Sequence, residues 1–174
     1  CGPGNNGGDG FVASRYLREW GFSTAVLASH NNSRGQTAIN ARDSAGEITI
    51  WPDKPEGDYS LIVDCLLGAG AGLGDSLRSP IAEVAAWARG MDVPILACDI
   101  PTGLGGPDVL TADTTITYHS MKQGLHSSKA GEVRVSELPW PAEVEDCGPG
   151  DAKRYPRLDA TARKGDRGRL WVIG

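Results

Sequence analysis

The 174-residue sequence has few of the features that mark membrane proteins or nucleic-acid-binding proteins. Its longest apolar runs fall short of the roughly 18 residues that span a bilayer, and no signal peptide precedes the first predicted element. The formal net charge of −5 argues against nucleic acid, because phosphate binding favours a basic surface. We therefore expect neither a membrane nor a nucleic acid among the partners.

Cysteine and histidine are also scarce, with four and three residues, and neither type shows metal-ligand spacing. Cys65 and Cys98 lie in apolar runs, where buried free thiols are usual. This cysteine usage favours a reducing, cytoplasmic location. We interpret His30, His119 and His126 as ordinary surface or strand residues.

Glycine, by contrast, is abundant and clustered, with 24 residues or about twice the usual share. The sequence opens on "CGPGNNGGDG", directly before a helical pattern over 11–20. Without Cβ atoms, Gly4, Gly7 and Gly8 could let backbone N–H groups approach an anion at a helix N-terminus. A purely structural tight turn explains the glycines equally well. The segment is not a Walker A loop, because no Gly-Lys-Ser/Thr ends it. We do not interpret it as a G-x-G-x-x-G dinucleotide fingerprint, and no ribose-binding acid lies about 20 residues further on, which argues against an ordinary NAD-dependent dehydrogenase.

Strand and helix patterns alternate along the rest of the chain. Short apolar runs predict strands at 24–28, 48–51, 60–68, 93–103, 114–118 and 132–135. Helical patterns lie at 11–20, 34–45 and 81–89, with Gly21 ending the first and Ser79 and Pro80 opening the last. This alternation predicts an α/β fold with a parallel sheet and helices on both faces. We expect Trp20, Trp51 and Trp87 to lie in the core or to cover the sheet.

Two acids interrupt buried strands at their carboxyl ends, which is where ligands bind in an open α/β sheet. Asp64 lies within "LIVDCLLGAGAGLG" and Asp99 within "ILACDIPTG". A buried acid is costly unless it is hydrogen-bonded, paired or bound to a cation. Each acid alone could simply cap a loop. Together with "NNGGDG" at the same sheet edge, they predict one shared site.

Four segments, taken in order, carry a family resemblance: "CGPGNNGGDGFVASRYL", "VDCLLGAG", "DIPTGL", and "KQGL" followed by "GEVRV". They resemble the YjeF N-terminal domain family, whose enzymes are NAD(P)HX epimerases that repair hydrated nicotinamide cofactors. The resemblance covers roughly residues 1–140 and implies a Rossmann-like three-layer α/β/α sandwich with a mostly parallel sheet. It implies the dinucleotide NAD(P)HX as substrate and a bound potassium ion (K+), and it leaves a homodimer open.

The same resemblance implies roles for particular residues. It places substrate on Asn5, Asn6, Gly7, Gly8, Asp9, Gly68, Ala69, Gly70, Ala71, Gly72, Leu73, Gly74 and Asp99. It places K+ on Asn6, Asp64 and Thr102, where the family usually has Ser in place of Thr. The reaction needs a group that protonates the leaving hydroxyl and deprotonates the incoming water. We assign this role to Asp99, with Asp9 as the second candidate. Lys122 is either a phosphate contact or a solvated side chain.

The sequence departs from the family pattern in two places. The loop that follows Asp64, "GAGAGLGDSLRSP", is about two residues longer than usual. Gly105 stands where the family usually has Asp or Asn, which removes a polar group near the site.

The resemblance also implies the domain organisation. We expect a YjeF N-terminal domain at 1–144 whose first strand would precede Cys1, a linker at 145–162, and the first strand of a ribokinase-like dehydratase domain at 163–174. The sequence is thus interpreted as a fragment of a bifunctional NAD(P)HX repair protein. The competing hypothesis is a non-catalytic nucleotide-binding or scaffold module of the same fold.

Overall fold

The computed structural model describes residues 1–139. The linker expected at 145–162 and the dehydratase strand expected at 163–174 lie outside the described residues. Contacts within the chain define a first unit at Cys1–Leu138.

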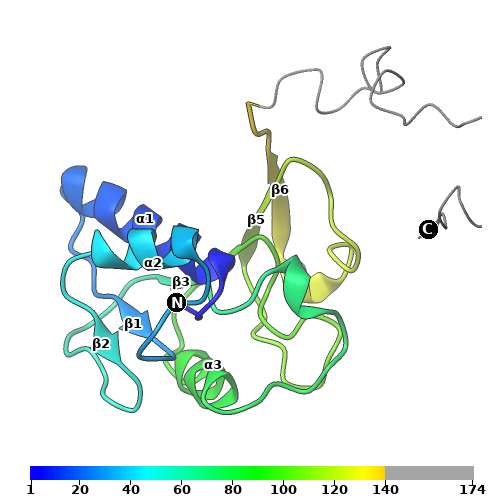
Figure 1. Cartoon of the computed structure of the whole chain (residues 1–174). Helices are drawn as coiled ribbons and strands as arrows, with labels where there is room; N and C mark the ends of the chain where they lie inside the picture. The colour runs from blue at the N-terminus through cyan, green and yellow to red at the C-terminus, as the bar shows by residue number, and fades with distance from the viewer. Residues whose placement is uncertain (140–174) are drawn as a thin grey trace, which may run out of the picture. The chain divides into compact units, whose positions relative to one another are not determined.

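Helices and strands alternate along the described unit, as the sequence pattern predicts (Figure 1). In chain order the helices and strands are α1 (Asn5–Glu19), β1 (Leu27–Ala28), α2 (Gln36–Asp43), β2 (Thr49–Ile50), β3 (Ile62–Asp64), α3 (Ile81–Arg89), β4 (Ile95–Cys98), β5 (Thr114–Tyr118) and β6 (Glu132–Ser136). Two short 3-10 helices are added, η1 (Ala69–Ala71) and η2 (Ser128–Ala130).

All strand pairs are parallel, and they form two sheets. One contains β1 and β2, and the other has the order β3-β4-β5-β6. Cys1 and Gly2 connect the two sheets: the Cys1 amine donates to Leu27 O at 2.7 Å, and Gly2 N–H donates to Cys65 O at 2.9 Å. A strand ahead of Cys1 stays a prediction.

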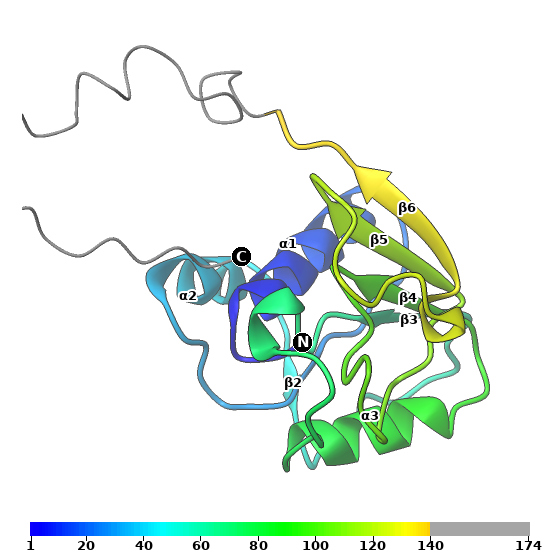
Figure 2. The same cartoon turned by 90° about the vertical axis from the view of Figure 1, so that its right-hand side faces the viewer.

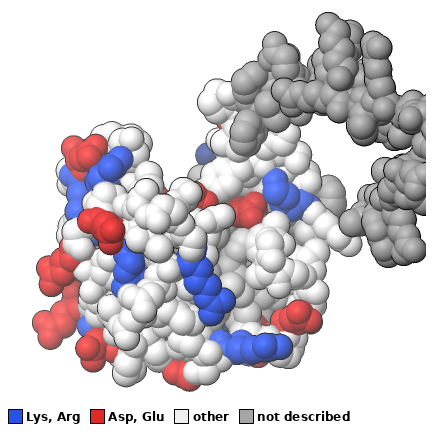
Figure 3. Space-filling view, in the orientation of Figure 1, with Lys and Arg blue, Asp and Glu red and all other residues white. Residues whose placement is uncertain are grey.

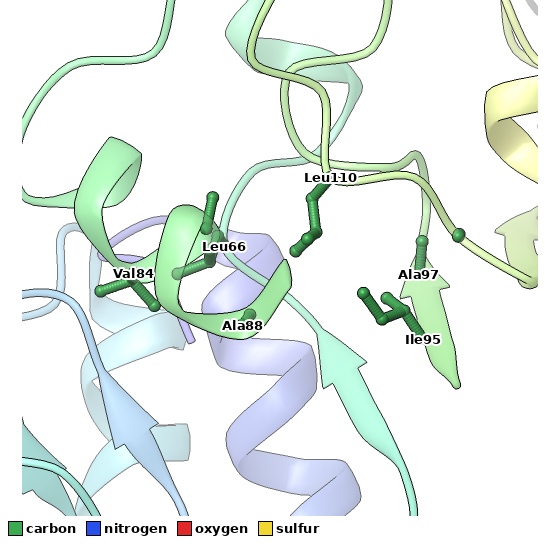
Figure 4. Packing of buried hydrophobic residues seen from close by; sticks show 8 residues of the cluster. Leu66, Val84, Ala88, Ile95, Ala97 and Leu110 are labelled. Atoms are coloured by element: carbon green, nitrogen blue, oxygen red, sulfur yellow. The ribbon is translucent and has the colours of Figure 1, made fainter. Parts of the chain in front are cut away.

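The helices cover both faces of the sheets, with α1 and α2 on one side and α3 on the other (Figures 1 and 2). On the α3 side, Val84 and Ala88 pack against Leu66, Ile95 and neighbouring apolar side chains (Figure 4). A separate cluster around the fully buried Phe11 packs α1 against β1 and α2. The predicted α/β/α layering is therefore confirmed, and it fixes the strand ends at one edge.

Two details of the sequence interpretation need correction. α1 begins at Asn5, six residues before the helical pattern becomes visible, so "NNGGDG" lies inside the helix. Trp20 is 71% exposed and belongs to neither core nor sheet cover, whereas Trp51 and Trp87 do pack against the α3 cluster. The pattern predicted α3 correctly over Ile81–Arg89, although no side chain caps its first turn.

Among the described residues, no helix is long and apolar enough to cross a membrane. The face shown in Figure 3 carries acidic and basic side chains intermixed, rather than one broad basic stripe.

Candidate active site

The glycine-rich opening forms the start of α1 rather than a loop ahead of it. α1 has Gly4 as its N-cap residue, and no side chain caps its first N–H groups. Gly7 and Gly8 are both buried. A Cβ at Gly7 would lie 1.9 Å from a backbone oxygen of the preceding turn, and one at Gly8 would lie 3.3 Å from Ala38 Cα in α2. Close packing therefore requires both glycines, which supports the structural alternative of the sequence analysis. Their contact with substrate through the backbone stays a prediction.

Asp64 ends β3 and is 2% exposed. Its Oδ1 accepts hydrogen bonds from Leu66 N–H at 3.1 Å and from the Thr102 hydroxyl at 2.8 Å, and its Oδ2 accepts one from Thr102 N–H at 2.8 Å. The fully buried Thr102 hydroxyl accepts in turn from Leu67 N–H at 3.0 Å. Burial raises the pKa of Asp64, and the bonds from Thr102 and Leu66 act in the opposite direction. The carboxyl is thus already hydrogen-bonded within the chain and does not need a cation for compensation.

Asp99 follows β4 directly and adopts φ +69°, a backbone region that is uncommon outside glycine. Its N–H donates to Ile116 O of β5 at 2.8 Å, and its Oδ2 accepts from Ala69 N–H at 2.7 Å. A Cβ placed on Gly68 would lie 2.7 Å from Asp99 Oδ2 and 3.2 Å from Asn6 Cβ. The start of α1, the loop after β3 and the end of β4 therefore meet at one place, as the sequence predicts.

The Asn6 side chain has unused hydrogen-bonding capacity at this meeting point. Its Oδ1 and Nδ2 are both shielded from solvent, and neither has a hydrogen-bond partner within residues 1–139. A buried polar group without a partner costs about 1–3 kcal/mol, so such a group calls for an explanation. Asn6 also lies in the first turn of α1, where free N–H groups favour an anion. A bound ligand would supply the missing partners.

Asp9 and Tyr118 extend the site toward β5. Although Asp9 reaches solvent, partial burial of its carboxyl and the negative charge of Asp99 raise its pKa. Burial, together with the nearby Cys98 and Asp9, raises the pKa of Tyr118. No motif in the sequence singles out Tyr118. Its position could have indicated a place at the site, because the predicted strand at 114–118 ends on this residue at the same edge as Asp99.

The loop that follows β3 continues from Gly68 to Gly74. Because the family resemblance implies substrate contact for this loop, it is here called the substrate arc. Ala69 to Gly74 are exposed, and η1 forms the first half of the arc. Asp99 holds its base through the Ala69 N–H, and Leu104 O accepts a hydrogen bond from Gly74 N–H at 3.1 Å at its far end.

The remaining candidates of the sequence analysis lie elsewhere or are already engaged. Lys122 Nζ donates to the carbonyls of Tyr118 and Ser120 at 2.5 and 3.0 Å, so its ammonium group holds a turn. His30 Nδ1 lies 2.9 Å from a serine hydroxyl. His119 and His126 are exposed.

These features define a class of protein. An open parallel α/β sheet, with a helix start, two acids and an unpartnered amide gathered at its carboxyl edge, is the architecture of nucleotide-binding α/β proteins. Residues 1–124 match the family described as YjeF-related protein N-terminus, and the chain belongs to that family.

Several named proteins resemble this chain along most of its length. It is 34% identical over 185 residues to the bifunctional NAD(P)H-hydrate repair enzyme Nnr of Archaeoglobus fulgidus, covering 100% of this chain and 39% of that protein. The enzyme of the same description from Escherichia coli is 33% identical, with 100% and 38% covered. The NAD(P)H-hydrate epimerase of Rhodopirellula baltica is 36% identical over 163 residues, with 83% and 66% covered. The chain thus spans less than two thirds of each relative.

A solved structure supports the fold. The crystal structure of the yeast protein ynu0 superposes with a TM-score of 0.55 at 21% identity, covering 68% of this chain and 55% of that one.

Proposed function

We propose that this domain interconverts the R and S forms of hydrated NADH and NADPH, as an NAD(P)HX epimerase within a nicotinamide repair enzyme. The relatives of R. baltica and E. coli carry names that support this activity. The observation that carries the proposal is the meeting of Asp99 with the unpartnered Asn6 amide beside Gly68. A carboxyl group and an unsatisfied amide at a helix N-terminus suit a polar, phosphate-bearing substrate.

The reaction requires one proton to leave and return. The hydrated ring bears a hydroxyl on the carbon next to the ring nitrogen. Once this hydroxyl is protonated, the lone pair of the nitrogen expels it as water. A carboxyl that gives up this proton becomes the carboxylate that accepts one from the water attacking the other face. Such acid/base catalysis contributes about 10²–10⁴-fold. We assign the proton transfer to Asp99, because Ala69 N–H fixes its Oδ2 and thereby orients its carboxyl.

Potassium is the finer part of the proposal. Asn6 Oδ1 lacks a partner, and Asp64 and Thr102 add carboxylate and hydroxyl oxygens, the ligand types that hard cations prefer. These residues fit K+, although the Thr102 hydroxyl already serves Asp64 and Leu67. When bound, K+ would supply positive charge that orders the Asn6 amide and neighbouring loops. We also keep as predictions a homodimer, the domain limits at 144 and 162, and a reducing cytoplasm, which the free thiols of Cys65 and Cys98 favour.

Replacement of Asp99 by Asn tests the catalytic assignment. Asp99→Asn keeps the size of the side chain and its carbonyl acceptor for Ala69 N–H, but it removes the acid/base group. We expect the full-length protein to interconvert pure R-NAD(P)HX and its S epimer roughly 10²-fold more slowly, while the Kd for NADP+ changes little. Chromatography of the two epimers gives the rate, and calorimetry gives the Kd.

Asp9→Asn is the matched control, because it neutralises the second carboxyl and should affect binding at least as much as turnover. An Asp99→Asn protein that epimerises at the wild-type rate would move the proton transfer elsewhere, first to Asp9. A wild-type protein that binds dinucleotide but never accelerates epimerisation would favour the scaffold alternative.

A further inference from the structure

The substrate arc contacts a second glycine-rich loop, "GLGG" at 103–106, which follows β4. Gly74 N–H donates to Leu104 O at 3.1 Å, so the far end of the arc is tied to this loop by its backbone. Together with the bond from Ala69 N–H to Asp99 at the base, this contact ties both ends of the arc to the segment that follows β4.

The two loops approach so closely that side chains would not fit between them. A Cβ at Gly105 would lie 3.2 Å from Gly74 N and 3.5 Å from Gly74 Cα. A Cβ at Gly106 would lie 2.6 Å from Asp75 O. Contacts this short involve backbone atoms, which cannot turn aside as a side chain can. A side chain at 106 would therefore collide with the backbone just past the arc, and one at 105 would force Gly74 of the arc to shift by a few tenths of an ångström.

The Leu73 side chain lies near two other loops at the same end of the arc. A Cβ at Gly124, in the loop after β5, would lie 3.2 Å from Leu104 Cδ2 and 3.6 Å from Leu73 Cδ1. Leu73 thus reaches from the arc toward the loops after β4 and β5. It remains 37% exposed, which means that its side chain is not part of the main core.

We propose that Gly105 and Leu73 are positioning residues: Gly105 leaves the space that the arc occupies, and Leu73 holds the arc in that space, so that the arc can contact the dinucleotide. The proposal rests on the proposed function for its substrate. The proposal also gives one cause for two features of the sequence, the longer loop after Asp64 and the glycine at position 105. The longer loop occupies the space where a side chain at 105 would lie.

The two anchors of the arc predict which kinetic constant responds. Asp99 holds the base at Ala69, independently of Gly105, so displacement of the far end leaves the catalytic carboxyl in place. Loss of contacts made equally in the ground state and the transition state raises KM and leaves kcat unchanged.

The test compares Gly105→Asn with Gly21→Asn in the full-length protein. Both glycines have left-handed backbones, with φ +83° and +91°, and asparagine tolerates this region better than most residues. A Cβ at Gly21 has no atom within 4 Å, so this control carries the backbone strain without the contact. We expect Gly105→Asn to raise KM for NAD(P)HX roughly ten-fold or more, with kcat within about two-fold of wild type, and Gly21→Asn to change neither.

Leu73→Ala provides a second perturbation that should fold, because the side chain is partly exposed. We expect it to raise KM in the same direction. A folded Gly105→Asn protein with the wild-type KM would overturn the proposal, and so would a lowered kcat at unchanged KM. If Gly105→Asn does not fold, an unchanged KM for Leu73→Ala overturns it.

Limited proteolysis separates this proposal from the epimerase assignment. Thermolysin cleaves before apolar residues such as Leu73. Gly105→Asn should be cut within 68–75 faster than wild type or Gly21→Asn, as mass spectrometry of the fragments would show. If wild-type protein shows no epimerase activity, the proposed function fails, and this cleavage pattern alone decides whether Gly105 positions the arc. Equal cleavage rates in the three proteins would refute that role.

Discussion

Replacing Thr102 by Val removes a single buried hydroxyl that has two partners. Thr102 is fully buried, and Val has nearly its shape, so the change deletes hydrogen bonds without opening a large cavity. The bonds lost are the one donated to Asp64 Oδ1 at 2.8 Å and the one accepted from Leu67 N–H at 3.0 Å. The bond from Thr102 N–H to Asp64 Oδ2 remains.

The expected loss can be worked out from these contacts. A hydrogen bond to a charged group contributes about 1.5–3 kcal/mol, and a buried N–H left without a partner costs about 1–3 kcal/mol. Because the Leu67 N–H is only partly buried, the lower half of that range applies to it. We expect Thr102→Val to lower the free energy of unfolding by about 3 kcal/mol. Thr102→Ser keeps the hydroxyl and loses one buried methyl group, so about 1 kcal/mol is expected.

Urea unfolding at neutral pH measures both variants, with an unchanged m-value as the check that compactness is preserved. The melting temperature in potassium chloride, compared with that in tetramethylammonium chloride, tests the role of the cation. A ligand that binds only the native state stabilises it in proportion to RT ln(1 + [L]/Kd). Wild type and Thr102→Ser should melt higher in potassium, and Thr102→Val should not. If Val costs no more than Ser, the reasoning about the Asp64–Thr102 pair is wrong. If wild type melts equally in both salts, Asn6, Asp64 and Thr102 do not form a potassium site.

Two further outcomes are expected. Gly8→Val should lower the free energy of unfolding by roughly 1–3 kcal/mol, because its side chain would press on Ala38 of α2; urea unfolding checks this, and an unchanged midpoint would show that α1 and α2 can move apart freely. The Asp9 carboxyl has a raised pKa, so it becomes neutral as the pH falls through that value, before an ordinary aspartate would. We therefore expect NAD+, whose pyrophosphate stays ionised, to bind more tightly as the pH falls from neutral into the range where this carboxyl becomes protonated. Asp9→Asn should flatten this profile in calorimetry, and a wild-type affinity that is constant over the range would contradict the raised pKa.

Periodicity and burial could be predicted well from the sequence wherever a run of apolar residues had a single interpretation. α3 and β5 lie at the positions predicted for them, and the strand ends gather Asp64 and Asp99 at one edge. Such features follow from local patterns plus the rule that parallel strands share a carboxyl edge. The register adds what no pattern contains: Asp64 pairs with Ala97, and Cys98 with Ile116, which places Tyr118 beside the site.

Contacts between segments distant in sequence could not be predicted in this way. Trp20 continues the apolar stripe of α1, yet it is 71% exposed, because a helical stripe is buried only where another element covers it. The start of α1 was missed for a related reason. Glycine has a low helix propensity, but burial of Gly7 and Gly8 against neighbouring backbone outweighs that preference.

The glycines show most clearly where inference from sequence ends. A glycine is required when a side chain would strike something, and the sequence does not say whether that is a ligand or the protein itself. At Gly7 and Gly8 the obstacle is protein, although both lie in a segment that resembles a substrate loop. At Gly105 the obstacle is again protein, namely the substrate arc itself. Residues that bind substrate and residues that shape the binding loop can thus carry the same sequence pattern. The distances between segments distinguish substrate-binding residues from loop-shaping residues. KM and kcat measured on matched variants then distinguish their effects on the reaction.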